Sequence, residues 1–229
     1  MINGKKRYCL WLKDCPQNKI DKMPLVKHRV NIVRDFRLAS AKGATRRKAT
    51  TPTLFTEDRH VDADSIFMPM ISSENRQYVP IGFIDGKTIV NNKSLFIPNA
   101  TIYLFGILIS KVHMAWMRAI CDRLKSDYSY STTIIYNTFP FPPPKNQITI
   151  EKTAQRILQE REALVNYSLA DMYDAGHMPK KLYDAHRAND RAVMAAYGFD
   201  ESMSESEIVA ALMKLYQKLT ANIDRVAKI

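Results

Sequence analysis

The sequence of 229 residues predicts an α+β fold, in which a mixed strand and helix region over residues 1–144 is followed by a small all-helical region over residues 145–229. Short apolar runs separated by turn residues between residues 65 and 100 indicate strands. Apolar residues recur at helical spacing from Gln147 onward. The Pro-rich stretch Phe139–Pro144 is rigid and extended, so we predict the boundary between the two regions directly after it.

The N-terminal part of the first region predicts a strand, a helix and a loop. Arg7–Leu12 is short, apolar and aromatic, which is typical of a buried strand. Pro24 suits the first turn of a helix, and apolar side chains follow at helical spacing from Leu25 to Ala41. Lys42–Pro52 has no apolar period and combines cations with small and hydroxyl residues, so it predicts a mobile loop.

The middle of the first region contains four apolar runs that predict strands, and these are Ile66–Ile71, Tyr78–Ile84, Thr88–Val90 and Ser94–Ile97. Asp85-Gly86, between the second and third runs, is typical of a hairpin turn. Ile102–Leu124 keeps an apolar stripe at helical spacing and predicts one long helix. Ile134–Tyr136 predicts a further strand.

Start and stop signals divide the second region into helices. Ser168–Asp171 resembles a capping box with Asp in the acidic position. A helix is predicted over Pro179–Tyr197, and Gly198 is a natural stop after it. Ser204–Glu207 is a full capping box and predicts the start of a last helix.

The net charge of the chain is confined to the first region. The whole chain carries 34 Lys and Arg against 23 Asp and Glu, a net charge of +11. Residues 1–144 contain 22 basic and 11 acidic residues, whereas residues 145–229 contain 12 of each. A strongly basic region needs a partner with many negative charges, and nucleic acid is the usual one. The neutral region is then expected to be a packing or docking unit.

Cysteine usage and hydropathy exclude several classes of protein. Cys9, Cys15 and Cys121 are scattered, which argues against a disulfide framework or a zinc site and favours a reducing compartment. The longest apolar run, Ile102–Ile109, is far shorter than the roughly 20 residues of a membrane span. No signal-peptide pattern follows Met1–Lys6, so we expect a cytoplasmic protein.

The sequence lacks the motifs of the common enzyme classes. None of its seven glycines forms a phosphate-binding or dinucleotide-binding loop, and neither a G-x-S-x-G elbow nor an H-E-x-x-H helix occurs. The five histidines do not pair with cysteines or carboxylates at ligand spacing. We therefore predict no catalytic, cofactor-binding or metal-binding residue on this chain.

Several basic or polar segments of the first region are candidates for contact with nucleic acid. A helix face with Lys27 and Arg34, and the basic loop after it, would hold phosphates, because cations displace counterions without fixed geometry. The loop Ser72–Arg76 offers Arg, Asn and Glu side chains that can bond to base edges. The candidate residues are Lys27, Arg34, Lys42, Arg46, Arg47, Lys48, Ser73, Glu74, Asn75, Arg76, Lys125, Ser126, Asp127, Tyr128 and Tyr130.

Each candidate also has a simpler alternative. The cations on the helix face are equally compatible with a solvated surface. An ordinary surface loop is the alternative for Lys42–Pro52, and a generic polar turn is the alternative for Ser72–Arg76. Tyr128 or Tyr130 would stack on a base or fill the space that a flipped base leaves, and burial in the core is the alternative for both.

Six segments of the chain carry a resemblance to a known family, and these are Arg7–Leu12 (RYCLWL), Arg29–Ser40, Ser72–Phe83 (SSENRQYVPIGF), Phe105–Ser131, Tyr136–Pro142 (YNTFPFP) and Ser168–Phe199. Together they resemble the C-terminal portion of the MmeI-like DNA methyltransferases, which are single-chain restriction-modification enzymes. The resemblance covers almost the whole chain, and it implies a DNA target recognition domain over residues 1–144 and a helical C-terminal domain over residues 145–229.

The resemblance implies a concrete function. In that family, a nuclease region and an adenine-N6 methyltransferase core precede a recognition domain that directs methylation and cleavage to a short DNA site. S-adenosylmethionine is the methyl donor, and the nuclease needs a divalent metal. Both groups belong to regions that this chain lacks, so neither is assigned to a residue here. The expected partners are duplex DNA and the methyltransferase core of the parent enzyme, in the same chain or in a separate one.

Two other function classes stay open on the sequence alone. The same positive charge and the Tyr-rich segment after residue 124 also suit an RNA-binding or single-strand-binding module. The stretch Pro140–Pro144 and the neutral helical region suit a protein-interaction subunit. Preference for single strands would favour the first class, and salt-insensitive retention of a protein without nucleic acid would favour the second.

Overall fold

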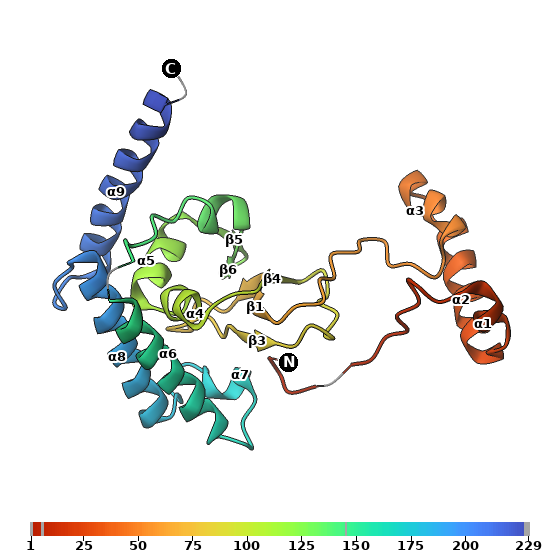
Figure 1. Cartoon of the computed structure of the whole chain (residues 1–229), viewed down its shortest axis with the longest axis horizontal. Helices are drawn as coiled ribbons and strands as arrows, with labels where there is room; N and C mark the ends of the chain where they lie inside the picture. Colours follow the sequence, from red (N-terminus) through yellow and green to blue (C-terminus); the bar gives the residue numbers. More distant parts are fainter. Residues whose placement is uncertain (1, 6, 145, 227–229) are drawn as a thin grey trace. The chain divides into compact units, whose positions relative to one another are not determined.

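The computed structural model describes residues 2–5, 7–144 and 146–226, with side chains as far as Ala221 (Figure 1). Small sheets and many helices confirm the predicted α+β class. The chain forms two compact units: Lys6–His60, which we call the basic unit, and Met1–Lys5 with Val61–Ile229, which we call the main unit. The division predicted after residue 144 falls inside the main unit and stays a prediction based on sequence pattern.

The basic unit is a small group of helices. Its elements are α1 (Gln17–Asp21), α2 (Pro24–Leu38), α3 (Gly43–Arg47) and the 3-10 helix η1 (Lys48–Thr50). Pro24 opens α2, as predicted, because its missing N–H costs nothing at this position. The guanidinium of Arg37 is buried and donates hydrogen bonds to three backbone carbonyls. The accepting carbonyls are those of Lys48 at 2.8 Å, Thr51 at 2.8 Å and Leu54 at 2.7 Å.

Two predictions for the basic unit are wrong. Arg7–Leu12 runs as an irregular and largely exposed segment in place of a buried strand, with Tyr8 92% exposed. The predicted loop Lys42–Pro52 is mostly helical, since α3 and η1 cover residues 43–50. The bonds from Arg37 to carbonyls at and after the end of α3 fix this segment against α2. A polar composition predicted a loop, but it did not reveal an arginine from another helix that organises the backbone.

The described part of the main unit contains two small antiparallel sheets. In the first, β1 (Ser65–Pro69) lies between β3 (Gly82–Ile84) and β4 (Ser94–Pro98), and Ile66 pairs with Phe83 on one side and Ile97 on the other. In the second, β6 (Asp127–Ser129) lies between β2 (Ile71–Ser72) and β5 (Asp122–Leu124).

Three predicted elements of the main unit differ from the structure. A turn follows Asp85, but Thr88–Val90 is irregular, and β3 pairs with β1 instead of forming a hairpin. The long helix predicted over residues 102–124 is split into α4 (Ile102–Leu108) and α5 (Lys111–Ile120), because the Ser110 hydroxyl accepts from the backbone N–H of His113 and starts a new helix. The strand predicted at residues 134–136 is a π-helical turn, η2 (Thr132–Tyr136).

The C-terminal helices follow the predicted start and stop signals. They are α6 (Gln147–Glu162), α7 (Leu169–Met172), α8 (Lys180–Tyr197) and α9 (Glu205–Val226). Both capping boxes form: the Ser168 and Ser204 hydroxyls accept from backbone N–H groups three residues on, while the acidic side chains of Asp171 and Glu207 accept in return. Gly198 ends α8 in the left-handed conformation, with φ of 71°.

One continuous hydrophobic core joins the sheets and the C-terminal helices within the main unit. Helix α6 packs against α4 and α8, α5 packs against α9, and α9 projects beyond the other elements (Figure 1). The contact between α4 and α6 is close, because a Cβ atom at Gly106 would lie 2.8 Å from Ile150 Cγ2. Trp116 and Ile135 are fully buried in this core, together with Ile157 and Leu212 from the C-terminal helices. Among the helices described, none has the length and apolar character to cross a membrane.

Candidate nucleic-acid interface

Most of the net positive charge belongs to the basic unit. Residues 6–60 contain 14 Lys and Arg against five Asp and Glu, a net charge of +9, whereas the remaining residues contain 20 against 18. The charge asymmetry in the sequence therefore corresponds to a compact unit of the structure. A small unit with this charge is suited to hold a polyanion.

The candidate cations on α2 are exposed but already have acidic neighbours. Lys27 Nζ lies 2.9 Å from a carboxylate oxygen of Asp21, and Arg34 Nε lies 3.1 Å from one of Asp35. The hydrogen bond from Lys27 lowers the pKa of Asp21, so this carboxylate keeps its charge. Part of the charge on this helix face is thus neutralised by residues of the same unit.

The candidate cations after α2 lie on α3 and η1 and at the residue before them. Lys42, Arg46, Arg47 and Lys48 are all exposed. Arg46 Nη1 donates to the backbone carbonyls of Ser40 at 2.8 Å and Ala41 at 2.9 Å, so this side chain braces the turn after α2. Arg47 forms neither a salt bridge nor a side-chain hydrogen bond within the described part of the chain. Its guanidinium is therefore the one on this helix best placed to bind an external anion.

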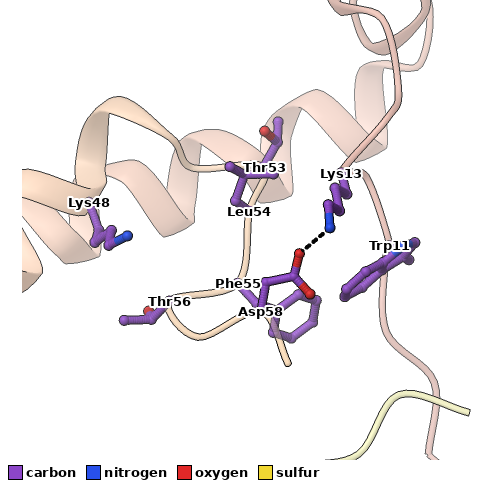
Figure 2. Close-up of a pocket in the computed structure, with 8 residues that line it drawn as sticks. All are labelled: Trp11, Lys13, Lys48, Thr53, Leu54, Phe55, Thr56 and Asp58. Carbon is purple, nitrogen blue, oxygen red and sulfur yellow. Dashed lines mark ion pairs between the residues drawn. The ribbon is translucent and has the colours of Figure 1, made fainter. Parts of the chain in front are cut away.

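A small pocket beside these cations was not predicted (Figure 2). Trp11 forms one wall, with its ring 5.5 Å from that of Phe55, and Lys48 lies on the opposite side. Lys13 and Asp58, which both line the pocket, form an ion pair of 2.5 Å, and the hydrogen bond from Lys13 lowers the pKa of Asp58. The lining residues are Trp11, Lys13, Lys48, Thr53, Leu54, Phe55, Thr56 and Asp58.

The polar loop after β2 is a tight turn on the surface of the main unit. Glu74 and Asn75 are exposed, while Ser73 and Arg76 are half-buried. The backbone N–H of Arg76 donates to the Ser73 carbonyl at 3.2 Å, and the Ser73 hydroxyl accepts from the backbone N–H of Asn75 at 3.3 Å. The turn therefore presents Glu, Asn and Arg side chains next to one another from a fixed backbone.

The structure brings the two predicted base-reading segments together. β2 pairs with β6, so the loop after β2 lies beside the hairpin of β5 and β6, whose turn contains Lys125 and Ser126. The Tyr128 hydroxyl donates to the Glu74 carbonyl at 3.3 Å. Arg123, which the sequence analysis did not select, lies 4.2 Å from the centre of the Tyr128 ring and 3.7 Å from the Glu74 carboxylate. The strand register reveals this arginine, because Arg123 in β5 pairs with Tyr128 in β6.

Both candidate tyrosines are buried, which is the alternative that the sequence left open for them. Tyr128 is 6% exposed and Tyr130 is 5% exposed. The Tyr130 hydroxyl lies 3.0 Å from His113 Nε2, and His113 Nδ1 lies 2.9 Å from the Leu108 carbonyl. Burial lowers the pKa of His113 to about 4, so this histidine is a neutral part of the core at neutral pH. In this conformation, neither ring is available as a stacking surface.

Comparison with known families identifies both regions of the chain. Residues 1–143 match the family model described as the MmeI target recognition domain, and residues 142–224 match the MmeI C-terminal domain. The chain belongs to the MmeI family. The part that matches the MmeI target recognition domain therefore includes the basic unit, both sheets, the Ser73–Arg76 loop and the turn of the β5–β6 hairpin. The part that matches the MmeI C-terminal domain includes α6 to α9.

Two relatives support this assignment. A protein named DNA methyltransferase A from Bacillus subtilis (strain 168) is 40% identical over 221 residues, which cover 96% of this chain and 25% of the relative. A solved structure of the type IIL restriction-modification enzyme MmeI in complex with DNA is 42% identical, with a TM-score of 0.92 over 96% of this chain and 30% of that one. The chain thus spans between a quarter and a third of the length of these relatives.

Proposed function

We propose that this chain is the sequence-specific duplex DNA recognition part of a bifunctional restriction-modification enzyme, which directs adenine-N6 methylation and cleavage to a short site. The observation that carries this proposal is that the Ser73–Arg76 loop and the turn of the β5–β6 hairpin lie at the same end of the strands of a small sheet. Their Arg, Asn, Glu and Asp side chains match the donor and acceptor patterns of base edges in the major groove. The family membership and the DNA complex of MmeI agree with this function.

The two units would divide the work of binding. In protein–DNA complexes, phosphate contacts position the protein and base contacts specify the sequence. We assign the phosphate contacts to the basic unit, with Lys42, Arg47 and Lys48 as the exposed cations, and the base contacts to the loops of the main unit. Arg46 has a structural task in this scheme, because both of its bonds are to carbonyls of its own turn.

The chemical steps would belong to other regions of the parent enzyme. Within the ranges that the structure describes, no group of three or more His, Cys, Asp and Glu side chains is arranged to hold a metal ion. We propose that S-adenosylmethionine and the divalent metal bind to other regions of the parent enzyme. The methyltransferase core is the proposed protein partner, and the cytoplasm, where free thiols persist, is the proposed location.

A protein-contact role has an observation of its own in the basic unit. Helix α2 exposes a stripe of apolar side chains, with Leu25 79%, Ile32 54% and Phe36 74% exposed. These residues follow each other at helical spacing on one face. An apolar stripe on a basic unit is compatible with docking to the catalytic core of the parent enzyme, so this role adds to DNA recognition and does not replace it. The RNA-binding alternative is weakened, because Tyr128 and Tyr130 are buried.

The proposal is tested by binding the chain to a randomised duplex DNA pool at two salt concentrations and sequencing the retained fraction. We expect enrichment of a short motif. Arg76→Ala should relax the preference at one position of that motif, at a cost of about 1–3 kcal/mol. Arg156→Ala, which removes an exposed arginine from α6 in the C-terminal domain, is the matched control and should leave the motif intact.

Each other outcome of this experiment has a definite meaning. Uniform weakening of Arg76→Ala across all sequences would make Arg76 a phosphate contact. Salt-sensitive retention without a motif would mean that this chain only clamps DNA, and that specificity requires the rest of the enzyme. Absence of retention at low salt, or better retention of single strands and RNA, would contradict the proposed function.

A further inference from the structure

The segment that leaves the Ser73–Arg76 loop is held by the C-terminal domain at three successive positions. These are the Gln77 carbonyl, the Tyr78 hydroxyl and the Ile81 carbonyl. Asp190 and Arg161, which bond to Tyr78 and Ile81, lie on α8 and α6, whereas Arg118, which bonds to Gln77, lies on α5 and is bonded in turn to Glu205 of α9. The loop thus ends on a backbone whose course is set by α6, α8 and α9, which lie outside the target recognition domain in sequence.

The first attachment is a bridge through Arg118 on α5. Its Nη1 donates to the Gln77 carbonyl at 3.3 Å, and its Nε donates to Glu205 Oε1 at 2.8 Å. Glu205 is the first residue of α9, where its negative charge is favoured by the helix dipole. The Arg118 side chain is only 20% exposed, so its planar guanidinium is fixed between the loop and the start of α9.

The second attachment is buried. Tyr78 is 1% exposed, and so is Asp190, which lies on α8. The Tyr78 hydroxyl donates to Asp190 Oδ2 at 2.6 Å. Asp190 Oδ1 accepts from the backbone N–H of Lys111 at 2.7 Å, so one carboxyl group connects the end of the loop to the start of α5. The Tyr78 ring also stacks on His186, one turn earlier on α8, with ring centres 4.2 Å apart.

The third attachment is made by a buried arginine of α6. Arg161 Nη1 donates to the Ile81 carbonyl at 2.8 Å, and its Nε donates to the Tyr173 hydroxyl at 2.8 Å. That hydroxyl lies 2.7 Å from His186 Nε2. The second and third attachments therefore form one connected group, since His186 contacts both Tyr78 and Tyr173.

We propose that these contacts make the C-terminal domain a positioning device for the recognition loop, so that Tyr78, Asp190 and Glu205 help set the DNA sequence preference without touching DNA. This inference rests on the proposed function of the loop. A base-reading side chain discriminates only when its backbone is held in place, and loops on their own are less well fixed than helices and strands. Here the support comes from side chains that are buried or half-buried and bonded on both sides.

The competing explanation is that the same contacts only join two domains and add stability. A matched control separates the two explanations. The Tyr197 hydroxyl, also on α8, donates to the Pro140 carbonyl at 2.9 Å. Tyr197→Phe therefore removes one phenol hydrogen bond between α8 and the preceding region, as Tyr78→Phe does, but the bond is partly buried and lies at a place with no bond to the loop.

The first measurement is hydrogen exchange of the backbone amides of Ser73–Gln77 in the free 229-residue chain. Tyr78→Phe should accelerate this exchange about tenfold, because one strong buried hydrogen bond is lost. Glu205→Gln, which is half-exposed and should fold normally, is expected to accelerate it up to about fivefold. Tyr197→Phe should leave the loop unchanged. Unchanged loop exchange in both Tyr78→Phe and Glu205→Gln would overturn the proposal.

The second measurement repeats the randomised duplex pool with the same variants below their melting temperatures. Tyr78→Phe and Glu205→Gln should reduce discrimination at the position that Arg76→Ala relaxes, by up to about tenfold, while Tyr197→Phe keeps the wild-type motif. A wild-type motif in all variants would overturn the proposal, even if the loop exchanges faster. If the unaltered chain enriches no motif while the exchange result holds, the proposed function fails, and with it the specificity claim, but the attachment of the loop stands.

Discussion

The basic unit and the main unit use charged side chains in opposite ways. Few of the described residues of the basic unit are buried. Among its described cations, Arg37 is the one whose side chain is buried, while Arg46 bonds to its own turn from an exposed position. In the main unit, a near-neutral balance of charge accompanies a large core, and charged groups such as Arg161 and Asp190 are buried with partners. The comparison suggests that one unit supplies long-range attraction, while the other fixes geometry.

This difference explains why the two units should respond differently to the same kind of change. A unit with little buried surface has little stability in reserve, whereas a core that spans the two sheets and the C-terminal helices is highly cooperative. The chain has two tryptophans, Trp11 in the basic unit and Trp116 in the main unit, so a variant that keeps one of them, with phenylalanine at the other position, follows the unfolding of one unit. The predictions below use this pair as probes.

The largest effect is expected for Trp116→Ala. Trp116 is 1% exposed, its indole N–H donates to the Ile135 carbonyl at 3.2 Å, and its ring lies 6.1 Å from that of Tyr216 on α9. Loss of this side chain should lower the free energy of unfolding of the main unit by about 3–5 kcal/mol. Urea unfolding followed by circular dichroism checks the size of the effect. Trp11 fluorescence, which reports the basic unit, should shift much less, and an equal shift would mean that the two units unfold as one.

Acid should destabilise the main unit through His113. Its folded-state pKa is lowered from the ordinary 6.5 to about 4 by burial, so the unfolded chain binds a proton that the folded chain refuses. Stability is therefore complete above about pH 6.5 and falls as the pH drops toward 4, by about 3 kcal/mol over that range. The pKa of His186 is also lowered, mainly by burial and to a smaller extent by the positive charge of Arg161.

Unfolding by urea at several pH values from 7.5 to 4 measures this dependence directly. In His113→Gln, the amide can still bond to Tyr130 or Leu108 but does not titrate, so its stability should vary less with pH than that of the unaltered chain. Trp116 fluorescence should report the transition, because His113 belongs to the main unit. Identical pH profiles for the variant and the unaltered chain would show that His113 does not carry the effect.

A smaller and local effect is expected for Arg37→Lys. A lysine keeps the charge but cannot place two nitrogens against the carbonyls of Lys48, Thr51 and Leu54, so the segment after α3 should loosen. We expect a loss of about 2 kcal/mol in the basic unit alone. Trp11 fluorescence and limited proteolysis between residues 42 and 56 would report it, with Trp116 fluorescence as the internal control. Equal loss in both units would contradict their independence.

Local signals in the sequence predicted the helical half of the main unit well. Capping boxes at Ser168 and Ser204 and the stop at Gly198 depend on neighbouring residues, which the sequence displays directly. The strand pairing could not be read in this way. β1 pairs with both β3 and β4, and this choice depends on contacts between distant segments, so the hairpin expected at Asp85-Gly86 did not form. The helix expected over residues 102–124 was broken by Ser110, whose capping role was hidden in an apolar run.

The candidate interface was predictable in composition and not in geometry. Net charge pointed to Lys42–Lys48, whose cations are exposed, and the composition of Ser72–Arg76 pointed to a turn that exposes Glu74 and Asn75. The sequence could not show that Tyr128 points into the core, that Arg46 serves its own turn, or that Arg123 lies on the Tyr128 ring. Those outcomes are decided by strand register and by backbone carbonyls that need a partner, and neither has a local signature.

The smallest effect, and the sharpest test of the division between units, is expected for Arg47→Ala. Arg47 is exposed, and the described residues give it no ionic or hydrogen-bonding partner, so its removal should leave stability unchanged. If it holds one phosphate, the slope of log binding constant against log salt should become shallower by about 0.9, with the same sequence preference. Arg46→Ala should change stability more and the slope less, because its bonds go to Ser40 and Ala41. A changed motif in Arg47→Ala would mean that the basic unit also reads bases, and the separation of attraction from geometry would no longer hold.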